Sequence, residues 1–223
     1  MNSNSKKKNV RVYHFLSAKY GLEGLQEKHI KVARLLELND PFEFCCFDFS
    51  FRTLRENMGE LKRQMSAEMG FICCSRSFSN PVQWAHYAQK HKGVCLGFDI
   101  DEDLCMPVTY VSERINIDGL IRSGASEEDI FFAMISTKFD HWRYEDEVRF
   151  PVHFKKSKPC DEMVFYKIGP VLKLKQVILG CDSGFTKSEV LEAIGGCGEG
   201  VEVLKVRPDY KKFKMVIDDG VEC

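Results

Sequence analysis

The apolar and polar positions along the chain predict a mixture of strands and helices. Alternation with a period of two, or a short continuous apolar run, predicts a strand, whereas an apolar residue every three to four positions predicts a helix. The predicted strands cover residues 10–16, 29–36, 71–77, 94–100, 107–111, 142–154, 163–168, 175–181, 201–206 and 213–217. The predicted helices cover residues 18–27, 54–69, 127–139 and 187–194.

Capping residues predict two further helices. Asp40 and Asn80 are each followed by a proline, and an acidic or amide side chain stands three residues after each of them. Proline fits the first helical position, and the later side chain completes a capping box. We therefore expect helices to begin at both residues and the second to stop at Gly93.

The order of these elements predicts the fold class. Helices interrupt the strands irregularly, without the strict alternation of a doubly wound parallel sheet. We expect an α+β fold with a mostly antiparallel split sheet, or a two-sheet core, and helices packed outside. A chain of 223 residues suits one hydrophobic core, so residues 10–223 are predicted as a single domain, after a disordered polar leader at residues 1–9.

Composition and charge indicate which class of protein the chain belongs to. A hydrophobic content of 44% and a charged content of 29% are typical of a globular protein. The formal net charge of −1 provides no broad basic field for nucleic acid or anionic lipid. No apolar run is long enough to span a bilayer or to act as a secretory signal, so we expect a cytoplasmic protein without a membrane partner.

The cysteines and histidines do not fall at the spacing of a zinc site. Structural zinc sites combine two Cys-x-x-Cys or Cys/His pairs, and the sequence contains none. His91 and Cys95 are separated by Gly93, where a helix is expected to stop. We predict reduced cysteines and no metal.

One strand collects charge that could carry chemistry. In a strand over residues 142–154, alternation places Glu145, Glu147 and Arg149 on one face and a mostly apolar set that includes Asp146 on the other. Two carboxylates and a guanidinium on a rigid strand can orient a hydroxyl or stabilise a developing cation. The alternative interpretation is a solvated, salt-bridged sheet surface, which is the commoner fate of such charges.

Other polar and aromatic residues are also candidates for a functional site, but their sequence patterns are less specific. His14 points opposite to Tyr13 in the first strand, where a histidine can equally be a core or edge residue. Trp84 and Tyr87 share a helix face that could stack a ring or simply pack on the sheet. Asn39 precedes a helix cap and has no evident structural role.

Four motifs, taken in order, resemble a bacterial family named domain of unknown function 2971. The resemblance runs from about residue 13 to residue 150 and continues weakly to residue 180. The motifs are Tyr13-His14-Phe15, Asn39-Asp40-Pro41-Phe42-Glu43, Trp84-x-x-Tyr87-Ala88-x-x-His91-x-Gly93-x-Cys95-Leu96-Gly97-Phe98 and Tyr144-Glu145-x-Glu147-x-Arg149.

A more distant resemblance suggests a mechanism. A histidine in the first strand, a tyrosine after a middle strand and a late Glu-x-Glu are similar to the pattern of ADP-ribosyltransferases, which bind NAD in the cleft of a split sheet. The resemblance implies that His14 contacts the NAD ribose and that Tyr87 stacks on nicotinamide. It makes Glu147 the catalytic residue and puts Glu145 near the acceptor.

The same resemblance extends the set of residues expected to bind NAD. Asn39 and Arg76 are candidates for the pyrophosphate, and Tyr13 and Trp84 complete the predicted set. The match is imperfect, because Cys74-Ser75-Arg76-Ser77 only loosely resembles the Ser-Thr-Ser triplet of those enzymes.

The resulting expectation is an NAD-consuming, ADP-ribosyltransferase-like enzyme that modifies a protein or nucleic acid in a bacterial cell. A toxin or phage-defence effector of this kind would act with an antitoxin or chaperone partner. Two alternatives stay open: a non-catalytic nucleotide-binding or sensor domain, and a metal-dependent hydrolase or nuclease that uses Glu145, Glu147 and Asp99.

Overall fold

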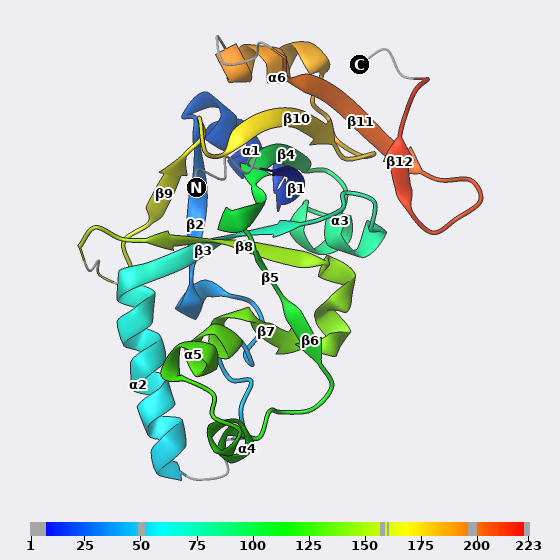
Figure 1. The fold of residues 1–223 in the computed structure, drawn as a ribbon. Helices are drawn as coiled ribbons and strands as arrows, with labels where there is room; N and C mark the ends of the chain where they lie inside the picture. Colours follow the sequence, from blue (N-terminus) through cyan, green and yellow to red (C-terminus); the bar gives the residue numbers. More distant parts are fainter. Residues whose placement is uncertain (1–7, 49–51, 157–158, 160, 196–199, 221–223) are drawn as a thin grey trace, which may run out of the picture.

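The computed structural model describes residues 8–48, 52–156, 159, 161–195 and 200–220. These residues form an α+β fold in which helices flank a large, curled, mixed sheet (Figure 1). The α+β class predicted from the sequence is confirmed. Of the predicted leader, residues 1–7 lie outside the described residues, and Asn9 already belongs to the first strand.

The strands match most of the predicted segments. They are β1 (Asn9–Leu16), β2 (His29–Arg34), β3 (Met69–Ser75), β4 (Val94–Asp101), β5 (Met106–Pro107), β6 (Thr109–Val111), β7 (Thr137–Phe139), β8 (Glu147–His153), β9 (Val164–Lys167), β10 (Lys173–Leu179), β11 (Glu202–Pro208) and β12 (Met215–Ile217).

The helices include short 3-10 segments, labelled η. They are α1 (Ala18–Gln26), η1 (Leu35–Glu37), α2 (Arg52–Glu68), α3 (Pro81–Tyr87), η2 (Glu102–Leu104), α4 (Ile117–Arg122), α5 (Glu127–Ser136), η3 (Asp140–Glu145) and α6 (Lys187–Ile194).

Within the described residues, ten strands form one sheet. Its order is β12-β11-β10-β4-β1-β3-β2-β9, and β8 lies between β3 and β5. The β10–β11 pairing is parallel, whereas the other pairings in this sheet are antiparallel. A separate parallel pair joins β6 to β7.

Strands β1 and β2 share one edge of β3, because β8 pairs with the whole opposite edge from Met69 to Ser75. Strand β1 meets β3 near its end, at Tyr13 opposite Ser75. Strand β2 meets it near its start, at Ala33 opposite Phe71. The two strands therefore diverge, and the middle of this edge of β3 has no strand partner. The candidate site lies in this gap.

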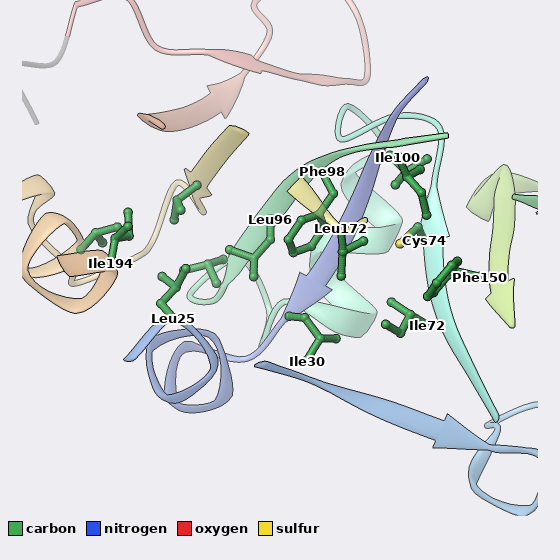
Figure 2. Packing of buried hydrophobic residues seen from close by; sticks show 14 of the residues in the cluster. Leu25, Ile30, Ile72, Cys74, Leu96, Phe98, Ile100, Phe150, Leu172 and Ile194 are labelled. Carbon is green, nitrogen blue, oxygen red and sulfur yellow. The ribbon is translucent and has the colours of Figure 1, made fainter. Parts of the chain in front are cut away.

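The main core fixes the sheet against its helices. Figure 2 shows Leu25 of α1 and Ile194 of α6 at one end, Phe98 of β4 in the middle, and Ile72 and Phe150 at the other end. These side chains are almost entirely removed from water, and each contributes about 1.5–3 kcal/mol of hydrophobic stabilisation. A second cluster lies under α2 and α5, and a third surrounds the buried Trp84.

The helix predicted to begin at Asp40 does not form. Asp40 Oδ1 accepts a hydrogen bond from Phe42 N at 2.9 Å, as a capping residue would, but the chain continues as turns. Phe44 has a left-handed φ of 67°, which ends any helical path. The expected capping carboxylate, Glu43, is buried instead beside Arg149.

The predicted helix after Asn80 is correct at its start and too long at its end. Asn80 caps Val82 N at 2.9 Å, with Pro81 at the first position. The helix stops at Tyr87, because Gln89, Lys90 and His91 all adopt positive φ.

Two other boundaries differ from the sequence pattern, and both matter for the site. Helix α5 ends at Ser136, and residues 137–139 form β7 beside β6 instead of a last helical turn. The long strand predicted over residues 142–154 begins only at Glu147, after the 3-10 helix η3. Helix α4 was not predicted, and the strand expected from Phe213 begins at Met215.

No helix in the described part of the chain has both the length and the apolar composition that crossing a bilayer requires.

Candidate functional site

A cavity of about 250 Å³ opens in the gap between β1 and β2. Its walls come from β1, β2, β3, the segment after η1, α3, β7, η3 and β8. The lining residues are Tyr13, His14, Phe15, Ala33, Glu37, Leu38, Asn39, Glu43, Cys73, Cys74, Ser75, Gln83, Tyr87, Lys138, Glu145 and Glu147. The cavity therefore contains six of the eight residues predicted to be catalytic or to bind NAD: Tyr13, His14, Asn39, Tyr87, Glu145 and Glu147.

Three buried carboxylates meet one lysine at the wall of this cavity. Lys138 Nζ lies 2.7 Å from Glu145 Oε2, 3.3 Å from Glu147 Oε2 and 3.2 Å from Glu43 Oε1. The ammonium also lies over the ring of Trp142, 4.9 Å from its centroid. Lys138 thus contacts all three carboxylates.

Arg149 completes this buried ionic network. Its Nη2 contacts both carboxylate oxygens of Glu43, at 2.8 and 2.9 Å, and its Nε donates to Glu147 Oε1 at 2.9 Å. Its Nη1 donates to Ile135 O at 2.8 Å. The network contains three carboxylates and two cations, so it carries a net negative charge when all five groups are ionised.

The surroundings shift the pKa values of Glu145 and Glu147 in opposite directions. Burial raises the pKa of Glu145 above its ordinary value, against the opposing effects of Lys138 and Tyr87. Burial has the same effect on Glu147, but Arg149 and Lys138 outweigh it and lower the pKa of Glu147 to about 2. A pair of carboxyl groups with separated pKa values suits distinct acid–base and electrostatic roles.

The interpretation of Glu145, Glu147 and Arg149 as a solvated surface is wrong, because all three are buried. The predicted placement of Glu145 and Glu147 on one continuous strand is also wrong. Glu145 ends η3 and Glu147 begins β8, and Asp146 between them has a left-handed φ of 44°. Asp146 N donates to Arg143 O at 3.2 Å, closing the turn that points both glutamates into the cavity.

His14 is fixed by the unpaired edge of β3. Its Nδ1 lies 2.8 Å from Cys73 O, in the gap that neither β1 nor β2 fills. Because a carbonyl oxygen only accepts, Nδ1 carries the proton, and Nε2 of the neutral ring is an acceptor. Burial lowers the pKa of His14 in spite of this hydrogen bond, so the ring is neutral at pH 7.

Tyr87 links the carboxylates to the cavity mouth. Its hydroxyl donates to Glu145 Oε1 and accepts a hydrogen bond of 2.8 Å from Asn39 Nδ2. Burial and Glu145 together raise the pKa of Tyr87, so the phenol keeps its proton. Asn39, which had no evident role in the sequence, thus orients the tyrosine.

Gln83 offers an unused acceptor at the cavity wall. Its Nε2 donates toward Tyr144 O at 3.1 Å and Ser75 Oγ at 3.2 Å. Its Oε1 is buried and lacks a hydrogen-bond partner among the described residues. A buried acceptor without a donor costs about 1–3 kcal/mol, which a ligand N–H or O–H would recover.

Three residues proposed from the sequence lie outside this cavity lining. Trp84 is fully buried in the third core cluster, where its indole N–H donates to Phe78 O. Arg76 is exposed and faces Asp146 at 3.8 Å. Asp99, named for the metal-dependent alternative, pairs with Arg11 at 2.5 Å.

Sequence reasoning missed Lys138, Glu43 and Gln83 as members of the site. The pattern assigns Lys138 to the last turn of a helix, and Glu43 and Gln83 to capping boxes. One sequence signal for Glu43 is its position between two phenylalanines. A charged residue flanked by large apolar residues is either exposed together with them or buried beside a partner of opposite charge. Among the described residues, no group of three or more His, Cys, Asp or Glu side chains is arranged to hold a metal ion.

Comparison with known proteins connects part of this site to a family. A family model described as "Protein of unknown function (DUF2971)" matches residues 83–114. This match supports the predicted kinship. The DUF2971 stretch begins in α3, includes Gln83 and Tyr87, and continues through β4, whereas the carboxylates lie outside it. No curated protein and no solved structure matches the chain.

Proposed function

We propose that this protein is an NAD-consuming enzyme, similar to ADP-ribosyltransferases, that transfers ADP-ribose to a macromolecule. The observation that carries the proposal is the convergence of His14, Tyr87, Glu145 and Glu147 on one cavity. These residues come from β1, from α3 and from the consecutive elements η3 and β8, which are three regions far apart in the sequence.

The charge of the site suits a glycosidic cleavage. When the bond between ribose C1′ and the nicotinamide nitrogen breaks, its electron pair moves to the ring nitrogen and C1′ becomes cationic. Glu147 is ionised at neutral pH because its pKa is about 2, and the buried network around it has an excess of carboxylates. A fixed carboxylate in a site shielded from water stabilises such an oxocarbenium-like cation.

Glu145 suits the acceptor side of the reaction. Its raised pKa makes it a better base than Glu147. In its ionised form it would take the proton of the attacking hydroxyl, amine or ring nitrogen as the new bond to C1′ forms. Tyr87, which donates to Glu145, fixes the direction of that carboxylate.

The rest of the cavity fits the nicotinamide end of NAD. Its aromatic lining, with Tyr13, Phe15 and Tyr87, offers apolar ring faces. The unpaired Gln83 Oε1 matches an amide N–H of the nicotinamide carboxamide. About 250 Å³ is below the roughly 300–1,000 Å³ typical of sites for whole ligands, so the adenosine end would extend out past Asn39.

The test is to incubate the purified protein with NAD labelled in the adenylate phosphate and with a bacterial lysate. We expect nicotinamide release and transfer of label to protein or nucleic acid. Glu147→Gln should lose at least a hundredfold in rate, whereas the matched variant Glu192→Gln on the exposed face of α6 should keep wild-type activity. Melting temperatures of both variants would show that they fold.

The result separates two outcomes. Release of nicotinamide that is unchanged in Glu147→Gln would overturn the assignment of the site. A rise in melting temperature with NAD but no nicotinamide release would instead identify a nucleotide-binding domain without turnover.

A further inference from the structure

The hairpin between β11 and β12 presents aromatic and basic side chains to solvent. Tyr210 is 86% exposed and Phe213 is 103% exposed, which makes Phe213 as accessible as in an extended chain. Lys211, Lys212 and Lys214 surround them and are also exposed. In Figure 1 this hairpin extends outward at the edge of the sheet, beyond α3.

Hydrogen bonds to the backbone fix the conformation of this loop. Asp209 Oδ1 accepts hydrogen bonds from Lys211 N at 2.7 Å and Lys212 N at 2.8 Å. Asp209 N donates to Lys214 O at 2.9 Å, and Met215 N donates to Ser79 O at 2.7 Å. The loop is therefore closed on itself and tied to the segment before α3, so binding would not need to order it.

The charge of the hairpin is positive on balance. The single acidic side chain of the loop, Asp209, is directed at backbone amides. Arg207 lies over the Tyr210 ring, 4.4 Å from its centroid, and its charge is offset by Asp218, whose Oδ1 is 3.6 Å from its Nε, so the excess positive charge comes from the three lysines. This local patch contrasts with a net charge of −1 for the whole chain.

We propose that this hairpin binds single-stranded nucleic acid. Lysines would contact the phosphates, and an unstacked base would lie on the free face of Phe213. An anionic bilayer is the weaker fit, because Arg207 already covers Tyr210 and leaves one ring to insert. The inference does not depend on the proposed NAD chemistry.

The experiment measures fluorescence anisotropy of fluorescein-labelled oligo(U) and oligo(dT) with the full chain, without NAD, over a series of salt concentrations. Phe213→Ala should weaken binding about tenfold, which is the loss of one stacked base. Replacing Lys211, Lys212 and Lys214 by alanine should make the negative slope of log K against log salt shallower by about 2, since each phosphate contact contributes about −0.7.

Matched controls use exposed residues elsewhere. Met163→Ala and Lys187→Ala should leave binding unchanged, because both residues are exposed and neither belongs to the hairpin: Met163 is 62% exposed, and Lys187 begins α6. Glu147→Gln should also bind normally, which separates this inference from the proposed catalysis. Absence of oligonucleotide binding, binding unaffected by Phe213→Ala, or binding to phosphatidylserine vesicles alone would overturn the proposal.

Discussion

Arg149 shows how a single side chain can determine whether a buried acidic site exists. It satisfies Glu43 on one side and Glu147 on the other, and both carboxylates are almost completely removed from water. Removing one partner of such a network leaves uncompensated charge in a medium that cannot solvate it. The ionic network therefore makes the site both possible and fragile.

Arg149→Met should lower the free energy of unfolding by about 3–5 kcal/mol. Urea denaturation followed by circular dichroism measures this loss. The matched variant Arg63→Met removes an exposed ion pair with Glu60 and should change stability by less than about 1 kcal/mol. Similar values for the two variants would contradict the structural role given to Arg149.

The depressed pKa of Glu147 predicts a loss of stability in acid. Because its pKa falls from 4.5 to about 2 on folding, its ionisation stabilises the fold above pH 4.5, and this contribution is lost as pH falls toward 2. Its full size is about 3 kcal/mol. The difference in unfolding free energy between wild type and Glu147→Gln should shrink through that interval; a constant difference would speak against the low pKa.

The ionisation of Glu145 affects the pH dependence of stability in the opposite direction. Its pKa is raised on folding, so the folded protein holds its proton more tightly, and that contribution decreases as pH rises through the raised pKa. We expect Glu145→Gln to flatten the decline of stability on the alkaline side of pH 4.5. Unfolding curves at a series of pH values measure the change of slope, and an unchanged slope would contradict the shift.

At the scale of elements, the turn after α3 explains where the helix ends. Gln89, Lys90 and His91 have φ values of 49°, 53° and 67°, and each such residue costs about 1–2 kcal/mol relative to ordinary backbone. His91 O accepts from Asp182 N at 3.1 Å, which holds the turn against the chain after β10. Tertiary contacts therefore override the local helical tendency.

Lys90→Gly should stabilise the protein by about 0.5–1 kcal/mol, because glycine adopts positive φ without steric cost. Lys92→Gly is the matched control: Lys92 lies in the same exposed turn but lacks positive φ, so glycine there should be destabilising. Thermal unfolding compares the two, and the same sign for both would contradict the backbone assignment.

The elements that the sequence predicts well are those whose residues face a uniform environment. The apolar run of β4 and the stripe of α2 are examples, and both form as expected. The segments around Glu43, Lys138 and Glu145 were misassigned because buried ion pairs, and not apolar periodicity, decide their backbone. His14, Tyr87 and the two glutamates were grouped from the ordered motifs, which do not depend on secondary structure, and these four residues do line one cavity.

At the scale of the whole molecule, two glycines permit segments to meet where a side chain would not fit. A Cβ on Gly180 would lie 2.0 Å from His91 O, and one on Gly93 would lie 2.1 Å from Leu16 O. The turn after α3 therefore lies directly against the ends of β1 and β10. The sequence alone does not reveal such a contact, because other glycines of this chain, such as Gly169 and Gly184, have nothing within 4 Å of an added Cβ.

Gly180→Ala should lower the free energy of unfolding by about 1–3 kcal/mol through overpacking. Gly59→Ala provides the control, since it lies in α2 with nothing within 4 Å of the added Cβ; it should raise stability by up to about 1 kcal/mol. Equal effects in chemical denaturation would show that space at Gly180 is not limiting.

The left-handed backbone conformation of Asp146 restricts which residue types can replace it. Glycine, asparagine and aspartate tolerate its φ of 44°, whereas a β-branched residue would be strained. Relatives that keep the paired acids should draw the intervening position from those three types. A relative with valine or isoleucine at this position would have to orient the residue equivalent to Glu145 differently. A comparison of homologous sequences at this one position could therefore separate relatives that keep the site from relatives that have lost it.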